Sequence, residues 1–168
     1  RWRYDMLAGS DVHGSTLGII GMGRIGQAIA RRAALGFGMR VLYHNRSRLD
    51  AAQEAALQAQ WVDKATLLAQ GDHVLLVVPY SAQTDHLIGA AELAQMKPSA
   101  TLVNIARGGV VDDAALAQAL VDGRIAAAGL DVFEREPALQ AGLAELPNVV
   151  LLPHLGSATH ATREKMAT

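Results

Sequence analysis

Hydrophobic and polar positions along the chain alternate between two patterns. Short, nearly continuous apolar runs predict β-strands at residues 16–20, 39–43, 60–62, 73–78, 101–105, 125–130 and 149–152. The run at 73–78 is typical of a parallel strand buried on both faces. Ala-rich stretches between the runs predict helices over 24–35, 49–59, 85–96, from the cap Asp63 to 69, and from Asp112 or Asp113 to about Gly123. The first helix is expected to carry Ile25, Ile29 and Ala33 on one face.

Strands that alternate with helices predict an α/β fold, a doubly wound parallel sheet of the Rossmann type. Right-handed crossovers place helices on both faces of such a sheet. Ligands bind at the carboxyl ends of its strands. The loops to inspect are therefore residues 21–24, 44–48, 79–84, 106–110, 131–137 and 153–157.

Composition narrows the possible functions. Hydrophobic residues make up 51% of the 168 residues and charged residues 18%, which excludes a disordered chain. The formal charge of −1 removes the electrostatic basis for binding nucleic acid, and no apolar run reaches the roughly 20 residues that cross a bilayer. Without Cys or an H-E-x-x-H motif, no metal site is predicted. We expect a cytoplasmic protein.

A glycine-rich loop lies between the first predicted strand and helix. Gly21, Gly23 and Gly26 fit G-x-G-x-x-G in the context that the dinucleotide fingerprint requires. Gly21 would form the tight turn, Gly23 would admit the pyrophosphate to the backbone, and Gly26 would allow helix and strand to pack closely. The helix N-terminus would then bind the phosphates.

The end of the second predicted strand indicates which dinucleotide is bound. NAD-binding domains place an acid there to bind the ribose 2′-OH, but here the first carboxylate after the strand is Asp50. Asn45, Arg46 and Ser47 could instead bind a 2′-phosphate, with Arg46 supplying the charge. The sequence therefore predicts NADP(H) in preference to NAD(H), which stays possible. In the alternative interpretation, Arg46 and Arg48 are solvated surface charges.

Three kinds of chemical group follow predicted strands. Arg107 could clamp a carboxylate, the segment 131–137 supplies three acids, and His154 precedes Gly156. Together they could serve as anion clamp, orienting acid and proton donor. The other histidines have weaker claims: His44 could line the phosphate site, His73 is interpreted as structural, and no partners at metal spacing accompany His13, His86 and His160.

Four segments, G-x-G-R-I-G, N-I-A-R-G-G, G-L-D-V-F-E-R-E-P and P-H-L-G-S-A-T, resemble the D-isomer-specific 2-hydroxyacid dehydrogenases. The Y-H-N-R-S run resembles their NADPH-dependent glyoxylate/hydroxypyruvate reductase and 2-ketogluconate reductase branch. The resemblance implies a catalytic set of Arg107, Glu136 and His154. It also implies that Asp131 meets the nicotinamide carboxamide. Further cofactor contacts are implied at Arg24, Ile25, Val78, Pro79, Thr84, Ile105, Ala106 and Gly156.

The activity that this resemblance implies is hydride transfer from NADPH to C2 of glyoxylate, hydroxypyruvate or 2-ketogluconate, giving the D-2-hydroxy acid. Arg107 would hold the keto oxygen and the carboxylate, and His154 would protonate the new alkoxide. Glu136 would accept a hydrogen bond from His154 and raise its pKa.

The ends of the chain change the expected domain organisation. The sequence begins at Arg1 without Met, and members of the resembled family have a second, substrate-binding domain. Residues 1–168 are thus expected to be the NAD(P)-binding domain alone, which could bind NADP(H) yet reduce little. The resemblance also implies a homodimer through this domain. Trp2, Tyr4, Met6 and Leu7 could contribute to that surface or pack as an ordinary N-terminal helix.

Other functions stay open at this point. An NAD-linked relative, such as a phosphoglycerate or formate dehydrogenase, is disfavoured by the missing acid after the second strand. A nicotinamide-sensing corepressor would keep the fold and bind partners, but the intact catalytic set favours an enzyme. A methyltransferase would not need that set.

Overall fold

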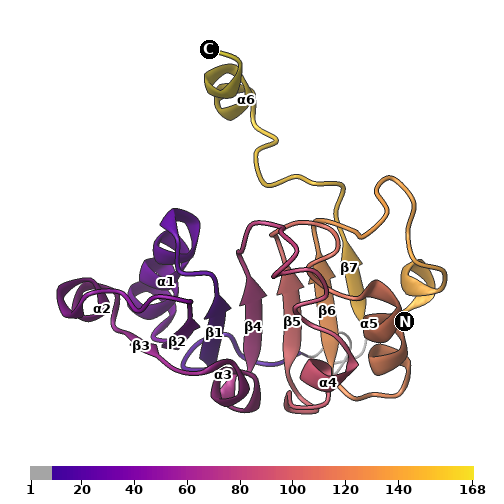
Figure 1. Ribbon diagram of the computed structural model, residues 1–168, viewed down its shortest axis with the longest axis horizontal. Coiled ribbons are helices and arrows are strands. Elements are labelled where there is room, and N and C mark those ends of the chain that lie inside the picture. Colours follow the sequence, from indigo (N-terminus) through magenta and orange to yellow (C-terminus); the bar gives the residue numbers. More distant parts are fainter. Residues whose placement is uncertain (1–8) are drawn as a thin grey trace, which may run out of the picture.

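The computed structural model describes residues 9–168 and contains a seven-stranded sheet in which every pair of neighbours is parallel (Figure 1). The strand order is β3-β2-β1-β4-β5-β6-β7. The strands are β1 (Thr16–Ile20), β2 (Arg40–His44), β3 (Ala59–Trp61), β4 (His73–Leu76), β5 (Thr101–Asn104), β6 (Ala127–Leu130) and β7 (Val149–Leu151). The first six follow the dinucleotide-binding order, so the predicted doubly wound sheet is confirmed.

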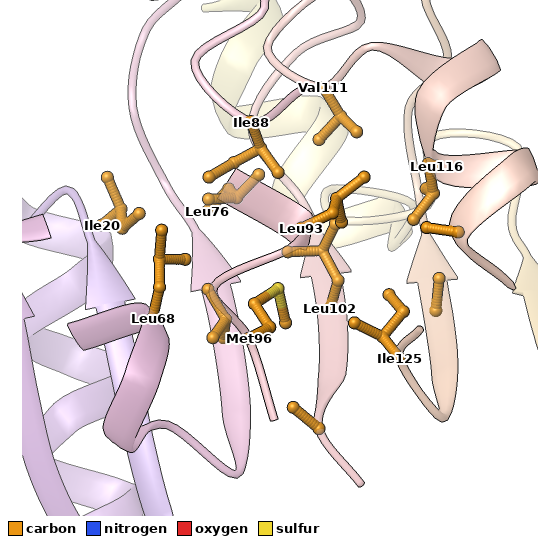
Figure 2. Packing of buried hydrophobic residues seen from close by; sticks show 14 of the residues in the cluster. Ile20, Leu68, Leu76, Ile88, Leu93, Met96, Leu102, Val111, Leu116 and Ile125 are labelled. Carbon is orange, nitrogen blue, oxygen red and sulfur yellow. The ribbon is translucent and has the colours of Figure 1, made fainter. Parts of the chain in front are cut away.

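Helices cover the sheet through two hydrophobic clusters. One cluster lies under α1 (Arg24–Phe37) and α2 (Ala51–Leu57). The other lies under α3 (Lys64–Gln70), α4 (Ala90–Leu93), α5 (Asp113–Val121) and the 3-10 helix η1 (Leu143–Glu145). Figure 2 shows part of this cluster, with Leu68 of α3, Leu93 of α4 and Leu116 of α5. The last helix, α6 (His160–Ala167), has no buried residue and projects from the carboxyl edge of the sheet (Figure 1).

Aspartates begin three of these helices. The Asp63 carboxylate accepts a 2.8 Å hydrogen bond from the Thr66 N–H, which confirms the predicted cap of α3. Asp50 forms a capping box with Gln53 at α2. Of the two candidates at α5, Asp112 is the cap, whereas Asp113 is buried at 3% exposure. The carboxyl group of Asp113 is therefore buried without serving as the cap, and burial raises its pKa.

The predicted helix over residues 85–96 is largely wrong. Only α4, Ala90–Leu93, is helical there. The preceding backbone is bonded elsewhere: the His86 N–H donates to the Gly109 carbonyl at 2.7 Å, and the Ile88 N–H donates to the Val110 carbonyl at 3.2 Å. Because these groups pair with a distant loop, they cannot form the bonds of a local helix.

The face of α1 that carries Ile25, Ile29 and Ala33 is only partly the buried one. Ile25 is 62% exposed, and the helix buries Gly26, Ala30, Ala33 and Ala34 instead. Small side chains let the helix approach the sheet closely, which shifts the buried face by one position. Ile25 is thereby left beside the glycine loop.

One prediction concerns residues that the structure does not describe. Trp2, Tyr4, Met6 and Leu7 lie outside the described residues. Within residues 9–168, no helix combines the length and apolarity needed to cross a membrane.

Candidate functional site

The site lies where the order of the sheet reverses. Strand β1 pairs with β2 on one side and with β4 on the other, so the loops after β1 and β4 flank a crevice at the carboxyl edge. Two adjoining clefts occupy this edge and share Ile25 and Val77 in their walls. One cleft lies against the glycine loop and the other against the predicted catalytic residues.

The glycine loop fits a dinucleotide pyrophosphate. Gly21 has φ +107°, and a Cβ there would lie 2.6 Å from the Val77 carbonyl oxygen. A Cβ on Gly26 would collide with the Gly21 carbonyl, whereas one on Gly23 would meet nothing within 4 Å. The first and third glycines are therefore required by packing, and the second leaves open space at the N-terminus of α1. That terminus has no side-chain cap and no acid in its first turn, which suits a phosphate.

A cleft of about 640 Å³ lies along this end of α1. It brings together the predicted Gly23, Arg24 and Ile25 and adds Arg32, which sequence reasoning missed. The Arg32 guanidinium donates to the Ala28 carbonyl at 2.8 Å. Its spacing of eight residues from Arg24 places both on one helical face, and this spacing could have revealed it.

The loop after β2 is fastened to the glycine loop. The Asn45 side-chain oxygen accepts a 2.7 Å hydrogen bond from the Met22 N–H, and the Asn45 carbonyl accepts one of 3.2 Å from the Trp61 indole N–H. The Gly21 N–H donates to the His44 carbonyl at 3.1 Å. Asn45 therefore joins two cofactor loops through its oxygen, and its amide N–H groups remain as donors for a ligand.

The two arginines of this loop differ in their partners. Arg48 forms two hydrogen bonds, of 2.9 and 2.6 Å, with the Glu54 carboxylate. Glu54 also accepts 2.7 Å from the Tyr43 hydroxyl, and these bonds from Arg48 and then Tyr43 lower the pKa of Glu54 to about 2. Arg46 contacts only a neutral partner in the described structure, the Gln83 oxygen at 3.2 Å. The exposed Arg46 is thus the one whose charge is available to an anionic ligand, while Ser47 is exposed beside it.

A second cleft, of about 750 Å³, brings the predicted catalytic residues together. Arg107, Glu136 and His154 line it from three different loops. The predicted cofactor contacts Ile25, Val78, Pro79, Ile105 and Ala106 line it too. The wall also includes residues that the sequence did not predict, namely Val77, Tyr80, Gly108, Phe133, Glu134 and Arg135. The last three lie inside the segment D-V-F-E-R-E-P.

Glu136 and His154 face each other at longer range than expected. The Glu136 Oε2 lies 3.8 Å from the His154 Nδ1, which is an ion-pair separation and not the predicted hydrogen bond. The other carboxylate oxygen of Glu136 accepts a 3.0 Å bond from the Phe133 N–H, which holds the side chain back on its own loop. Both side chains are nearly half exposed. The peptide bond between Glu136 and Pro137 is cis.

Asp131 holds the loop that carries the histidine. It is buried at 7% exposure, and its two carboxylate oxygens accept N–H bonds from Leu155 at 2.7 Å and Gly156 at 3.0 Å. Its carbonyl accepts a 3.0 Å bond from the His154 N–H. His154 has φ +55°, an unfavourable conformation that these three bonds maintain. Asp131 therefore aims His154, a role that its sequence motif alone did not reveal.

The loop of Arg107 is held from within the sheet. Asn104, 1% exposed, accepts a 3.0 Å bond from the Ala106 N–H through its side-chain oxygen. The Arg107 guanidinium donates to the Ala106 carbonyl at 2.6 Å and is otherwise open to solvent. Thr84, a predicted cofactor contact, accepts from the Ser81 N–H and donates to the Pro79 carbonyl, each at 2.8 Å. It shapes its loop and does not line either cleft.

This arrangement can bind an anion, deliver a proton and accept a nucleotide along one edge. Among residues 9–168 there is no group of three or more His, Asp or Glu side chains that could hold a metal ion. The cleft of Arg107 offers a guanidinium, an imidazole and carboxylates beside the glycine loop.

The chain is similar to known proteins over most of its length. The family model for the NAD binding domain of D-isomer specific 2-hydroxyacid dehydrogenases matches residues 1–156. Glyoxylate/hydroxypyruvate reductase B of Pectobacterium atrosepticum is 56% identical over 160 residues, which cover 95% of this chain and 50% of that protein. Glyoxylate reductase of Thermococcus gammatolerans is 55% identical over 166 residues, covering 99% and 49%.

A solved structure gives the same picture. The crystal structure of an NADPH-dependent glyoxylate/hydroxypyruvate reductase from Sinorhizobium meliloti superimposes with a TM-score of 0.84 at 41% identity, over 92% of this chain and 47% of that one. The chain spans about half the length of the curated relatives it matches.

Proposed function

Because the chain belongs to the family of D-isomer-specific 2-hydroxyacid dehydrogenases, we propose that it serves as the cofactor half of an NADPH-dependent 2-keto acid reductase. The observation that carries this proposal is the meeting of Arg107, Glu136 and His154 in one cleft that adjoins the glycine loop. In this proposal residues 1–168 are the NAD(P)-binding domain of a longer two-domain enzyme, consistent with their match to half of each relative.

The proposed roles follow from the chemistry of each group. Arg107 binds the substrate carboxylate and keto oxygen and offsets the negative charge that develops on that oxygen. His154 donates a proton to the oxygen as general acid. Glu136, 3.8 Å from the imidazole, draws closer once a substrate completes the cleft, as catalytic hydrogen bonds commonly do. NADP(H), when bound, supplies the hydride for C2.

The preference for NADP(H) rests on the loop after β2. No carboxylate occupies residues 43–49, and Glu54 is already paired with Arg48, so no free acid there would repel a 2′-phosphate. Arg46 retains its charge for the ligand, and the amide of Asn45 and the hydroxyl of Ser47 stand beside it. The S. meliloti relative is described as NADPH-dependent, which supports the same preference here.

The substrate is proposed as glyoxylate, hydroxypyruvate or 2-ketogluconate. The relative from P. atrosepticum is named for glyoxylate and hydroxypyruvate, and the relative from T. gammatolerans is named for glyoxylate. A small 2-keto acid presents a carboxylate and a carbonyl on adjacent carbons, and a single guanidinium can bind both. A cytoplasmic location and a homodimer formed through this domain are part of the same proposal, and light scattering of the purified protein tests the dimer.

The proposal is tested by assaying the full-length protein with each of the three acids, using NADPH and NADH in parallel. We expect reduction of at least one acid, with a higher kcat/KM for NADPH than for NADH. Absence of reduction with every pair would reject the proposed activity. A corepressor-like binding protein would bind NADPH and still fail this assay.

A further inference from the structure

A histidine outside the predicted catalytic set joins the loops that carry Arg107 and Glu136. His86 lies in the segment after β4, and its N–H donates to the Gly109 carbonyl at 2.7 Å, two residues beyond Arg107. Its imidazole Nε2 lies 3.2 Å from the Glu134 Oε1, two residues before Glu136. One residue therefore contacts both catalytic loops, through its backbone on one side and its side chain on the other.

Glu134 is in turn fixed to α5. Its N–H donates a 2.9 Å hydrogen bond to the buried carboxylate of Asp113. The two catalytic loops also touch directly, since a Cβ on Gly108 would collide with the Phe133 carbonyl oxygen. His86 completes this set of contacts from the exposed side, where its ring is 42% exposed and the Glu134 side chain is 28% exposed.

The conformation and charge of His86 both indicate a built feature. It has φ +44°, a conformation that is unfavourable for a non-glycine residue and persists only where the surrounding contacts hold it in place. The acids facing the ring are Glu134, Asp112 and Asp85, and His86 acts on Asp113 as well. Burial lowers the pKa of His86, but the hydrogen bond and charge of Glu134, with Asp112 and Asp85, outweigh it and raise the pKa overall.

We propose that His86 is a positioning residue, which through its contact with Glu134 fixes the distance between the loop of Arg107 and the loop of Glu136. This inference rests on the proposed function, because its consequence is the alignment of an anion clamp with a proton donor. His86 itself lines neither cleft and touches no reacting atom. Its contribution should therefore appear in kcat and leave cofactor binding at the other end of the site unchanged.

The proposal is tested in the full-length protein with the keto acid that it reduces best. We expect His86→Ala to lower kcat about tenfold and to leave the KM for NADPH within twofold, because a misplaced catalytic loop costs rate. His86→Gln should recover most of the activity, since its amide can donate to Glu134 without a charge. His13→Gln is the matched control, because His13 is an exposed histidine away from both clefts.

A double-mutant cycle separates positioning from general damage. Glu134→Ala and His86→Ala should each lower kcat by a similar factor, and the double variant should be no worse than either one. Multiplying losses, an unchanged kcat in His86→Ala, or an equal loss of NADPH affinity would each overturn the proposal.

An independent readout does not require turnover. In NMR spectra of the 168-residue chain with labelled histidine, the His86 ring should titrate above the ordinary pKa of histidine, and Glu134→Gln should lower its titration point. The contact is charged below the raised pKa of His86 and loses its charge as the pH rises through it. A titration point of the His86 ring that Glu134→Gln leaves unchanged rejects the contact with Glu134. Failure of the keto acid assay alone, with the NMR result as expected, rejects the proposed activity and not the contact.

Discussion

The cleft by β1 and β2 and the cleft by β5 to β7 are built to different degrees of completion. In the first, Gly21, Gly26 and Asn45 are fixed by close backbone contacts and hydrogen bonds of 2.7 to 3.2 Å, which leave a preformed space at Gly23. In the second, Glu136 and His154 are nearly half exposed and 3.8 Å apart. The difference teaches that the phosphate-binding loop is already formed, whereas the two groups proposed for proton transfer are not within hydrogen-bond distance of each other.

The largest expected effect is in the cleft that contains Arg107, Glu136 and His154. His154→Ala should lower kcat of the full-length protein by about 10²–10⁴-fold, because a general acid contributes that much. NADPH affinity should hardly change, since the phosphate-binding loop is untouched. Stopped-flow rates and fluorescence titration with NADPH measure the two quantities, and His160→Ala, on the exposed helix α6, is the control.

If His154→Ala weakened NADPH binding as much as turnover, cofactor binding and proton donation could not be assigned to different clefts. The assignment of the general acid to His154 would likewise fail if the variant kept full activity.

The next largest effect is expected in the cleft beside the glycine loop, where variants of Gly26 and Gly23 test two separate roles. Gly26→Ala should lower the free energy of unfolding by about 1–3 kcal/mol, because the new Cβ overpacks against the Gly21 carbonyl. The better helix propensity of Ala offsets less than about 1 kcal/mol of this loss. Gly23→Ala has open space around it and should change stability little, yet weaken NADPH about tenfold or more by filling the phosphate approach. Thermal unfolding and titration with NADPH report the two effects.

Equal stability losses in the two glycine variants would contradict the separate roles given to the two positions. An unchanged NADPH affinity in Gly23→Ala would show that the open space is not where the pyrophosphate approaches.

The smallest effect concerns the support beneath the phosphate loop. Glu54→Gln should slightly lower the melting temperature at pH 7 by weakening the contacts with Arg48 and Tyr43. The pKa of Glu54 is lowered from 4.5 to about 2, so its contribution is complete above about pH 4.5 and is lost as the pH falls toward 2. Melting curves of both proteins should therefore converge in acid, and a constant difference down to pH 2 would contradict the pairing.

The structure of the cleft beside the glycine loop could be predicted from sequence because the residues that indicate it are close together in the chain. The glycines, the apolar strand before them and the absent acid after β2 all lie within 35 residues, and their spacing carries their meaning. The strands were placed well for a similar reason, since each is a short apolar run.

The contacts around the cleft of Arg107, Glu136 and His154 could not be predicted in the same way. His86 and Glu134 are 48 residues apart, and no local pattern joins them. The same distant pairing defeated the predicted helix over 85–96, because the His86 and Ile88 N–H groups bond to residues 109 and 110. Asp131 likewise appeared in a motif, but its bonds to the loop of His154 depend on the neighbouring position of β6 and β7.

The most direct test of a preformed NADP(H) site in this chain is calorimetric titration of the 168 residues with NADPH and with NADH. We predict tighter binding of NADPH. Arg46→Ala should weaken NADPH more than NADH, while Arg48→Ala, whose charge is paired with Glu54, should discriminate far less between them. Equal affinity of the unaltered chain for the two nucleotides, or equal losses for both in Arg46→Ala, would contradict the account.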